Sequence, residues 1–291
     1  MNSGFTESSE KIKYEKQIVE YYETNEASYV DGWDLNNSYA MHYGYKDETT
    51  KTFGDTLLRM NWALAKEANI KSTDKVLDAG CGIGGSSIYL SKNIGCTCVG
   101  ITLSERQAEK ANRLAVSLGL EGKASFRAMS YLNTHFANES FDIVWGLESI
   151  CYAEDKEQFV KEAYRLLKPG GRLIIADGMV SDFENNKHPV IQKWLWGWRV
   201  NFLESPSRFQ QFFGEAGFKN VKYTDISRFT KASSRRLYWL YIANKIWAFW
   251  KKITFRYKWN KVQQDNIDAC LFQYKGMKMG LWGYGMIVGE K

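Results

Sequence analysis

The segment VLDAGCGIGGSS, residues 76–87, decides which fold this chain adopts. A short apolar run ends here, and glycines follow at positions 80, 82, 84 and 85. Gly80, Gly82 and Gly85 have the G-x-G-x-x-G spacing of a loop between a strand and a helix, where glycines allow a tight turn and a close approach of a nucleotide. The segment therefore predicts a nucleotide site at the first strand-to-helix turn of a sheet.

Two details argue against a dinucleotide at this turn. Asp78 precedes the glycines, where its carboxylate would repel a pyrophosphate but could hold an ammonium group. The next strand ends in GITLSERQ, residues 100–107, with Thr102 at the position of the expected ribose-binding acid. S-adenosylmethionine, which has an amino group, a sulfonium and no phosphate, fits better, because Thr102 and Gln107 can still bond ribose hydroxyls. A helix-dipole role for Asp78 and an NAD(P)-dependent oxidoreductase stay open as alternatives.

The pattern downstream of this turn alternates between strands and helices. Strands are expected over 75–79, 97–103, 124–129, 141–147 and 172–177, with helices between them, followed by a helix over 207–216 and strands over 218–225 and 281–290. This order predicts an α/β fold: a Rossmann-like, doubly wound, mainly parallel sheet of seven strands. Residues 1–70 are expected to form a helical N-terminal cover, and 71–291 the core, with aromatic lid insertions at 179–205 and 228–278.

Composition narrows the class of protein further. Hydrophobic residues make up 44% of the 291 positions and charged residues 25%, as in soluble globular proteins. The five cysteines and three histidines lack the spacing of a disulfide framework or a metal site, so no metal and a cytoplasmic, reducing location are expected. The net charge of +6 is uneven, because residues 228–278 hold twelve Lys and Arg but two acids.

Longer motifs carry a resemblance to a known family. The glycine segment, VGITLSERQ (99–107), SFDIVWGLESICYAEDK (140–156) and EAYRLLKPGGRLIIADG (162–178) resemble class I S-adenosylmethionine-dependent methyltransferases. YAMHYGY (39–45) and GLWGYG (280–285) are similar to the small-molecule branch that includes tocopherol-type and sterol-type C-methyltransferases. The resemblance implies an enzyme of class EC 2.1.1 with S-adenosyl-L-methionine as its cofactor.

The resemblance also implies which residues bind that cofactor. They are Tyr43, Asp78, Gly80, Cys81, Gly82, Thr102, Leu103, Gln107, Ser130, Tyr131 and Leu147. Asp78 and the glycine loop would hold the methionine part, with Tyr43 covering it, and Thr102, Leu103 and Gln107 would hold the ribose. Ser130 departs from the family pattern, which has an acid there for the adenine amino group, and a hydroxyl is a weaker partner.

Three residues are candidates for a general base. Asp177 and Glu148 end the fifth and fourth predicted strands, at the sheet edge where ligands bind, and His42 lies in the N-terminal motif. We favour Asp177, because it directly precedes the first insertion and should face the acceptor. Capping roles for both carboxylates remain open, as does catalysis by positioning alone, since methyl transfer requires alignment and no metal.

The aromatic insertions suggest the nature of the acceptor. Tyr152 and the tryptophans of WLWGWRV, Trp194, Trp196 and Trp198, either line a substrate cavity or pack in the core. If the acceptor is an alkene, such rings could stabilise a carbocation. We therefore expect a hydrophobic acceptor, an isoprenoid or a phenolic ring, methylated at carbon or oxygen. The alternative within the family is a small amine or carboxylate.

A basic, aromatic segment occupies residues 235–259 and begins RRLYWLYIANKIWAFWKK. Its wide apolar stripe predicts a lid packed on the sheet or on a second subunit of a homo-oligomer. The alternative is an interfacial helix in peripheral contact with an anionic membrane. No recognition motif supports binding to nucleic acid, so none is expected.

Overall fold

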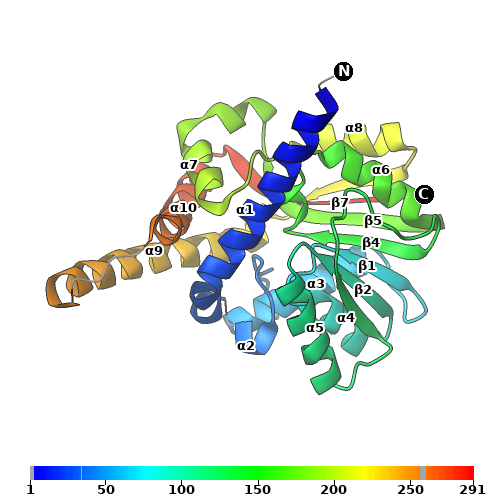
Figure 1. Ribbon diagram of the computed structural model, residues 1–291, viewed down its shortest axis with the longest axis horizontal. Helices are drawn as coiled ribbons and strands as arrows, with labels where there is room; N and C mark the ends of the chain where they lie inside the picture. Colours follow the sequence, from blue (N-terminus) through cyan, green and yellow to red (C-terminus); the bar gives the residue numbers. More distant parts are fainter. Residues whose placement is uncertain (1–2, 34, 256–259) are drawn as a thin grey trace.

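The sheet of the computed structural model has seven strands in the order β3-β2-β1-β4-β5-β7-β6 (Figure 1). The structure describes residues 3–33, 35–255 and 260–291. The strands are β1 (Lys75–Ala79), β2 (Thr97–Thr102), β3 (Ala124–Ala128), β4 (Phe141–Leu147), β5 (Leu167–Val180), β6 (Lys219–Asp225) and β7 (Trp282–Glu290). Strand β7 is antiparallel to β5 and β6, whereas the pairs among β1 to β5 are parallel. The predicted doubly wound, mainly parallel sheet is confirmed.

Helices cover both faces of this sheet. Helices α3 (Phe53–Glu67) and α4 (Gly85–Asn93) contribute to one apolar cluster, and α6 (Lys156–Leu166) and α8 (Pro206–Ala216) to a second one on the opposite face. Helix α5 (Glu105–Ser117) packs on β2 and β3. Ser104 caps α5, because its Oγ accepts a hydrogen bond from the Gln107 backbone N–H at 3.3 Å. Cys96 and Cys98 are fully buried and pack in the core.

Strand β5 is longer than predicted. The sequence indicated a strand over 172–177, but β5 extends at both ends, from Leu167 to Val180. Its C-terminal end continues because β7 pairs with it from Arg172 to Val180, and this pairing partner lies more than 100 residues later in the chain. The extension at this end adds Gly178, Met179 and Val180, so the strand continues past Asp177 into the start of the predicted first insertion.

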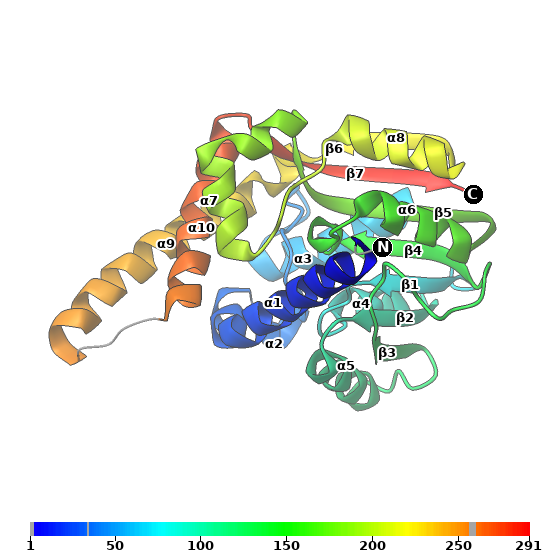
Figure 2. The ribbon, with the colours of Figure 1, turned by 45° about the horizontal axis from the view of Figure 1, so that its top comes forward.

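The remaining helices lie beyond the carboxyl ends of the parallel strands. They are α1 (Ser3–Gly32), α2 (Leu35–Ser38), α7 (Pro189–Trp198), α9 (Ser227–Phe255) and α10 (Lys261–Lys278), with short 3-10 turns η1 (Ile150–Tyr152) and η2 (Phe183–Lys187). Helices α7 and α10 pack so closely that a Cβ added at Gly197 would lie 2.3 Å from the Asp265 carbonyl oxygen. Helix α1 crosses the front of the strand ends, and α9 projects away from the body (Figures 1 and 2).

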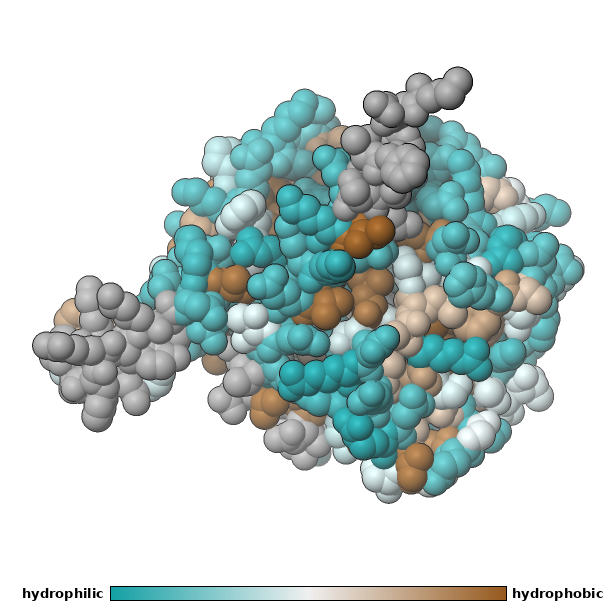
Figure 3. All heavy atoms as spheres, viewed as in Figure 1, coloured by the Kyte–Doolittle hydropathy of each residue, from teal (hydrophilic) through white to brown (hydrophobic). Residues whose placement is uncertain are grey.

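Within the described ranges, no helix combines the length and the apolar character required to cross a bilayer. The predicted cytoplasmic location and the homo-oligomer stay predictions. The division into a cover over 1–70 and a core over 71–291 also stays a prediction. On the face shown in Figure 3, hydrophilic residues cover the periphery, and apolar residues gather near the centre, in the region that α1 crosses in Figure 1.

Candidate active site

The loop after β1 forms one wall of a small cavity. Gly80, Gly82 and Gly84 have φ angles of +85°, +54° and +89°, the left-handed region that other residues rarely adopt. A side chain at Gly80 would also collide with Ser149, whose Cβ would lie 2.4 Å from the added Cβ. The predicted glycine turn therefore has a physical basis in both backbone angle and space.

Asp78 lies buried at the base of this cavity. Its Oδ2 accepts a hydrogen bond from the Ser87 hydroxyl of helix α4 at 2.7 Å. Burial raises the pKa of the Asp78 carboxyl to about 6, although the bonds from Ser87 lower it. Near pH 7 the group is therefore mostly a carboxylate, with one oxygen left for a cationic ligand.

Nine of the eleven predicted cofactor-binding residues line this cavity. They are Asp78, Gly80, Cys81, Gly82, Thr102, Leu103, Gln107, Tyr131 and Leu147. The Thr102 hydroxyl donates to Gln107 Oε1 at 2.7 Å, so the two groups predicted to hold ribose lie together. The described lining residues include no Lys or Arg, but they include the carboxyls of Asp78 and Glu148. This donor set suits a cationic nucleoside without phosphate, and S-adenosylmethionine fits it better than a dinucleotide does.

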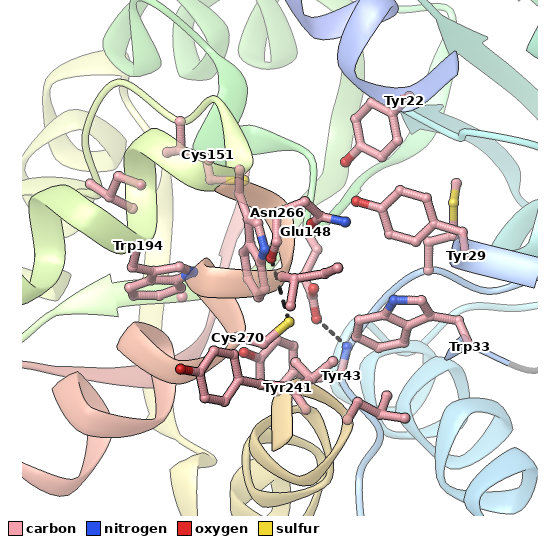
Figure 4. Close-up of a pocket in the computed structure, with 18 of the residues that line it drawn as sticks. Tyr22, Tyr29, Trp33, Tyr43, Glu148, Cys151, Trp194, Tyr241, Asn266 and Cys270 are labelled. Carbon is pink, nitrogen blue, oxygen red and sulfur yellow. Dashed lines mark hydrogen bonds between the residues drawn. The ribbon is translucent and has the colours of Figure 1, made fainter. Parts of the chain in front are cut away.

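A second, larger cavity of about 700 Å³ adjoins the first one (Figure 4). Its walls come from α1, η1, β5, α7, α9, α10, β7 and the segments that connect them. They are rich in aromatic rings: Tyr22, Tyr29, Trp33, Tyr43, Tyr152, Trp194, Trp198, Tyr241, Trp247, Trp282 and Tyr284. The described lining includes no Lys, Arg or His. The cavity is therefore suited to an apolar or cationic molecule and offers no cation for an acidic one.

Glu148 lines both cavities, at the point where they meet. Its backbone has φ +49° at the end of β4, an unusual conformation for this residue type. The Oε1 atom accepts bonds from the Tyr284 hydroxyl at 2.6 Å and from the Tyr43 backbone N–H at 2.5 Å. Burial raises the pKa of the Glu148 carboxyl to about 8, and the bond from Tyr284 lowers it in part. Such a group can exchange a proton near neutral pH.

Asp177 lines the large cavity but not the small one. Its Oδ2 accepts from the Cys151 backbone N–H and its Oδ1 from the Gly178 N–H, both at 2.8 Å. Burial raises the pKa of Asp177 to about 6, while these two N–H bonds lower it. The two backbone bonds fix the orientation of the carboxylate. Asp177 thus accepts one bond on each carboxylate oxygen, whereas both bonds to Glu148 go to Oε1, and of the two cavities Asp177 lines only the large one.

Comparison with known proteins agrees with this geometry. A family model described as "Methyltransferase domain" matches residues 77–175. Tocopherol O-methyltransferase of Arabidopsis thaliana is 38% identical over 178 residues, which cover 55% of this chain and 48% of that protein. Sterol 24-C-methyltransferase of Kluyveromyces lactis is 31% identical over 180 residues, 62% of this chain and 47% of that protein. The chain thus spans about half the length of these two relatives.

The solved structures show the same fold over nearly the whole chain. Geranyl diphosphate methyltransferase in complex with GPP and sinefungin superposes with a TM-score of 0.75 at 21% identity, covering 95% of this chain and 99% of that one. Residues 77–175 thus form a methyltransferase domain, of the class I S-adenosylmethionine-dependent kind. The cofactor predicted from the glycine loop is the cofactor of this family.

Two predicted cofactor residues of this methyltransferase lie elsewhere. The Tyr43 side chain lines the large cavity, and its hydroxyl donates to Gln273 Oε1 of α10 at 2.9 Å. The Ser130 hydroxyl donates to Glu15 Oε1 of α1 at 2.8 Å, and Ser130 lines a narrow cleft beside the small cavity. Tyr131, Leu103 and Ile18 line both the cleft and the small cavity. The Glu15 carboxylate of α1 therefore lies beside Ser130, the position at which the family pattern has an acid.

His42 lines the small cavity and is buried among neutral groups. Its Nδ1–H donates to the Tyr43 carbonyl at 2.9 Å, which leaves Nε2 to accept from the Asn61 amide at 3.4 Å. Burial lowers the pKa of His42 to about 4, so the ring is neutral near pH 7. It lies apart from the large cavity, and this placement favours Glu148 and Asp177 over His42 as proton acceptors.

The tryptophans of the first insertion divide between the two sides of α7. Trp194 and Trp198 line the large cavity, as does Tyr152, whose hydroxyl donates to the Trp198 carbonyl at 3.1 Å. The prediction that Trp196 lines a cavity or packs in the core was wrong, because its side chain is 65% exposed and its Nε1 donates to Asp265 at 3.2 Å. Residues two apart on a helix point about 200° apart, so the three rings cannot share one face.

Sequence reasoning missed two residues that shape the site. Tyr284 donates to Glu148, and the only sequence signal for it is the GLWGYG motif of the resemblance. Glu15 bonds Ser130 from a helix that carries no motif. In the part of the chain that the structure describes, no group of three or more His, Cys, Asp or Glu side chains is arranged to hold a metal ion.

Proposed function

We propose that this methyltransferase transfers the methyl group of S-adenosylmethionine to a carbon or oxygen atom of a hydrophobic small molecule, an isoprenoid or a phenol. The observation that supports this proposal is the large aromatic cavity of about 700 Å³, which meets the small cavity at Glu148. In this proposal the large cavity is the acceptor cavity and the small one is the cofactor cavity. Relatives named for tocopherol and sterol acceptors support the same class.

The charge of the cavity limits the acceptor further. A carboxylate or diphosphate would have no Lys, Arg or His partner among the described lining residues, and it would face the carboxyls of Glu148 and Asp177. The acceptor is therefore uncharged, or an amine that enters as its ammonium ion and gives up a proton to a carboxylate before its nitrogen is methylated, which is a second candidate function. The second candidate rests on the aromatic faces and the two carboxyl groups, which together suit a cation.

Glu148 is the proton acceptor in this proposal, in place of the Asp177 favoured from the sequence. The cofactor supplies a methyl group on a positively charged sulfur, and the acceptor loses a proton when a carbon or a hydroxyl oxygen is methylated. Glu148 lies between the two ligands, and its raised pKa makes the ionised form a good base. Asp177, held by the Cys151 and Gly178 N–H groups, orients the acceptor from the far side.

Helix α1 takes part in cofactor recognition in this proposal. The Glu15 carboxylate accepts a hydrogen bond from the adenine amino group, and the Ser130 hydroxyl orients that carboxylate. Support comes from the cleft that holds both residues, because it shares Ile18, Leu103 and Tyr131 with the cofactor cavity. The missing strand-end acid is thus replaced from the N-terminal helix.

The test is methyl transfer from isotopically labelled S-adenosylmethionine to a panel of acceptors. The panel holds a lipophilic phenol, an isoprenoid alkene, a lipophilic tertiary amine and a carboxylic acid of matched size, with products identified by mass spectrometry. Labelled phenol or alkene is expected, and label on the amine alone would favour the second candidate. Label on the acid alone, or cofactor binding without turnover on any member, would contradict the proposal.

A further inference from the structure

Helix α9 has two apolar sides, and only one of them faces the protein. The inner side contributes Leu237, Leu240, Tyr241 and Trp247 to the wall of the large cavity. Beyond this contact the helix leaves the body of the molecule and projects outward (Figures 1 and 2). The part of α9 that lines the acceptor cavity is therefore continuous with the part that projects from the protein.

The outer side of α9 carries the largest group of exposed aromatic side chains among the described residues. Trp239, Ile246, Phe249 and Trp250 are 61%, 55%, 61% and 60% exposed. Trp239, Ile246 and Trp250 are spaced by seven and four residues, which places them on one side of the helix. An apolar row of this kind on a projecting helix indicates that this surface binds an apolar partner.

The charge of helix α9 indicates the chemical nature of that partner. The sequence of α9 contains seven Lys and Arg residues and no Asp or Glu. A second copy of the chain packed on this helix would bring like charges together. A nucleic acid would leave the apolar row in water. An anionic lipid surface satisfies both features, because apolar side chains enter the acyl boundary while Lys and Arg side chains contact the headgroups.

We propose that α9 docks this protein on an anionic membrane surface through Trp239, Ile246, Phe249 and Trp250. Trp247 connects this surface to the acceptor cavity, because its side chain is 44% exposed and also lines the cavity wall. The mouth of the cavity then faces the lipid, so a lipophilic acceptor passes from membrane to cavity without crossing water. Residues 256–259, the end of the segment predicted for membrane contact, lie outside the described residues.

The test is co-sedimentation of the full chain with vesicles, without cofactor or acceptor, so that it does not depend on the proposed function. Vesicles of phosphatidylcholine alone are compared with vesicles containing 30% phosphatidylserine, at about 50 and 500 mM salt. The wild-type chain is expected to bind the anionic vesicles at low salt and to be released at high salt. The triple variant Ile246→Ser, Phe249→Ser, Trp250→Ser should lose about tenfold or more of this binding.

The matched control is Val116→Ser with Met279→Ser, which removes two other exposed apolar side chains (57% and 55% exposed) from elements other than α9. This control should bind vesicles like the wild-type chain, and both variants should keep the wild-type affinity for S-adenosylmethionine, which shows that they are folded. Absence of wild-type binding to either vesicle would overturn the proposal. So would equal losses in the two variants, or a triple variant that binds vesicles normally but changes the mass of the particle in solution.

Discussion

The two cavities of this methyltransferase are built in different ways. The cofactor cavity is shaped mainly by backbone: left-handed glycines after β1 and the ends of β2 and β4. The acceptor cavity is shaped by side chains from α1, α7, α9, α10 and β7, which lie far apart in the sequence. The first construction fixes a ligand that every member of the family shares, whereas the second can change its lining without disturbing the sheet. Glu148 belongs to both, and the largest effects should therefore arise there.

The first prediction tests whether Glu148 acts in the chemical step and not in ligand binding. Glu148→Gln should lower turnover by about 10² or more, because a general base contributes at least this factor. It should leave the affinity for S-adenosylmethionine within about threefold, since the amide can still accept from Tyr43 and Tyr284. Turnover is measured with labelled cofactor and affinity by calorimetry.

The same group predicts a pH dependence. The base acts only when ionised, and burial raises the pKa of Glu148 to about 8. In the wild-type enzyme kcat/KM should therefore rise as the pH increases from 6 through 8, and this rise should disappear in Glu148→Gln. Asp177→Asn is the comparison variant. If Asp177→Asn loses turnover and Glu148→Gln does not, the base is Asp177, and if both remain active, positioning alone carries the reaction.

Asp78 tests the cofactor cavity by itself. Asp78→Asn keeps the bond from Ser87 but removes the charge, so the affinity for S-adenosylmethionine should fall by about 1.5–3 kcal/mol, the range for a bond to a charged group. Because burial raises the pKa of Asp78 to about 6, wild-type affinity should also fall as the pH drops below 6, whereas the variant should show no such change. Calorimetry at pH 5.5 and 7.5 measures both. Unchanged affinity in the folded variant would leave Asp78 a structural role only.

The contrast between the cavities also explains what the sequence could predict. Asp78 with Ser87 and Thr102 with Gln107 are neighbours within nine residues, so strand ends and helix starts place them without knowledge of the rest of the chain. The Tyr284–Glu148 bond spans 136 residues and follows from the pairing of β7 with β5, which no local pattern specifies. The error at Trp196 was avoidable, because helical periodicity alone separates it from Trp194 and Trp198.

Trp198 and Trp196 lie on opposite sides of α7, so they provide a test of the acceptor cavity alone. Trp198→Ala removes a ring from the cavity wall and should raise KM for the acceptor about 10-fold or more, from the loss of buried apolar contact. Trp196→Ala, on the exposed side, should leave KM within about twofold and serves as the matched control. Steady-state kinetics at saturating cofactor measures both. Equal effects in the two variants would mean that this wall does not contact the acceptor.

The smallest expected effect is on cofactor affinity and concerns Glu15, a side chain of α1 beside the cofactor cavity. This residue comes from helix α1, which lies outside the sheet, yet its carboxylate accepts from Ser130 in the cleft beside the cofactor cavity. If it reads the adenine amino group, Glu15→Gln should weaken binding of S-adenosylhomocysteine about three- to tenfold, because a charged acceptor becomes a neutral one. Glu10→Gln, an exposed change on the same helix, should have no effect.

An analogue that carries a carbonyl oxygen in place of the adenine amino group makes this test specific. In the wild-type enzyme that oxygen faces the Glu15 carboxylate, so two acceptors meet and the analogue should bind about tenfold more weakly than S-adenosylhomocysteine. In Glu15→Gln the amide N–H₂ can donate to the carbonyl, and the preference should shrink or reverse. A general loss of packing would weaken both ligands equally, so it cannot imitate this exchange. If the preference is the same in both enzymes, adenine is recognised without Glu15, and α1 serves the cofactor site only as a cover.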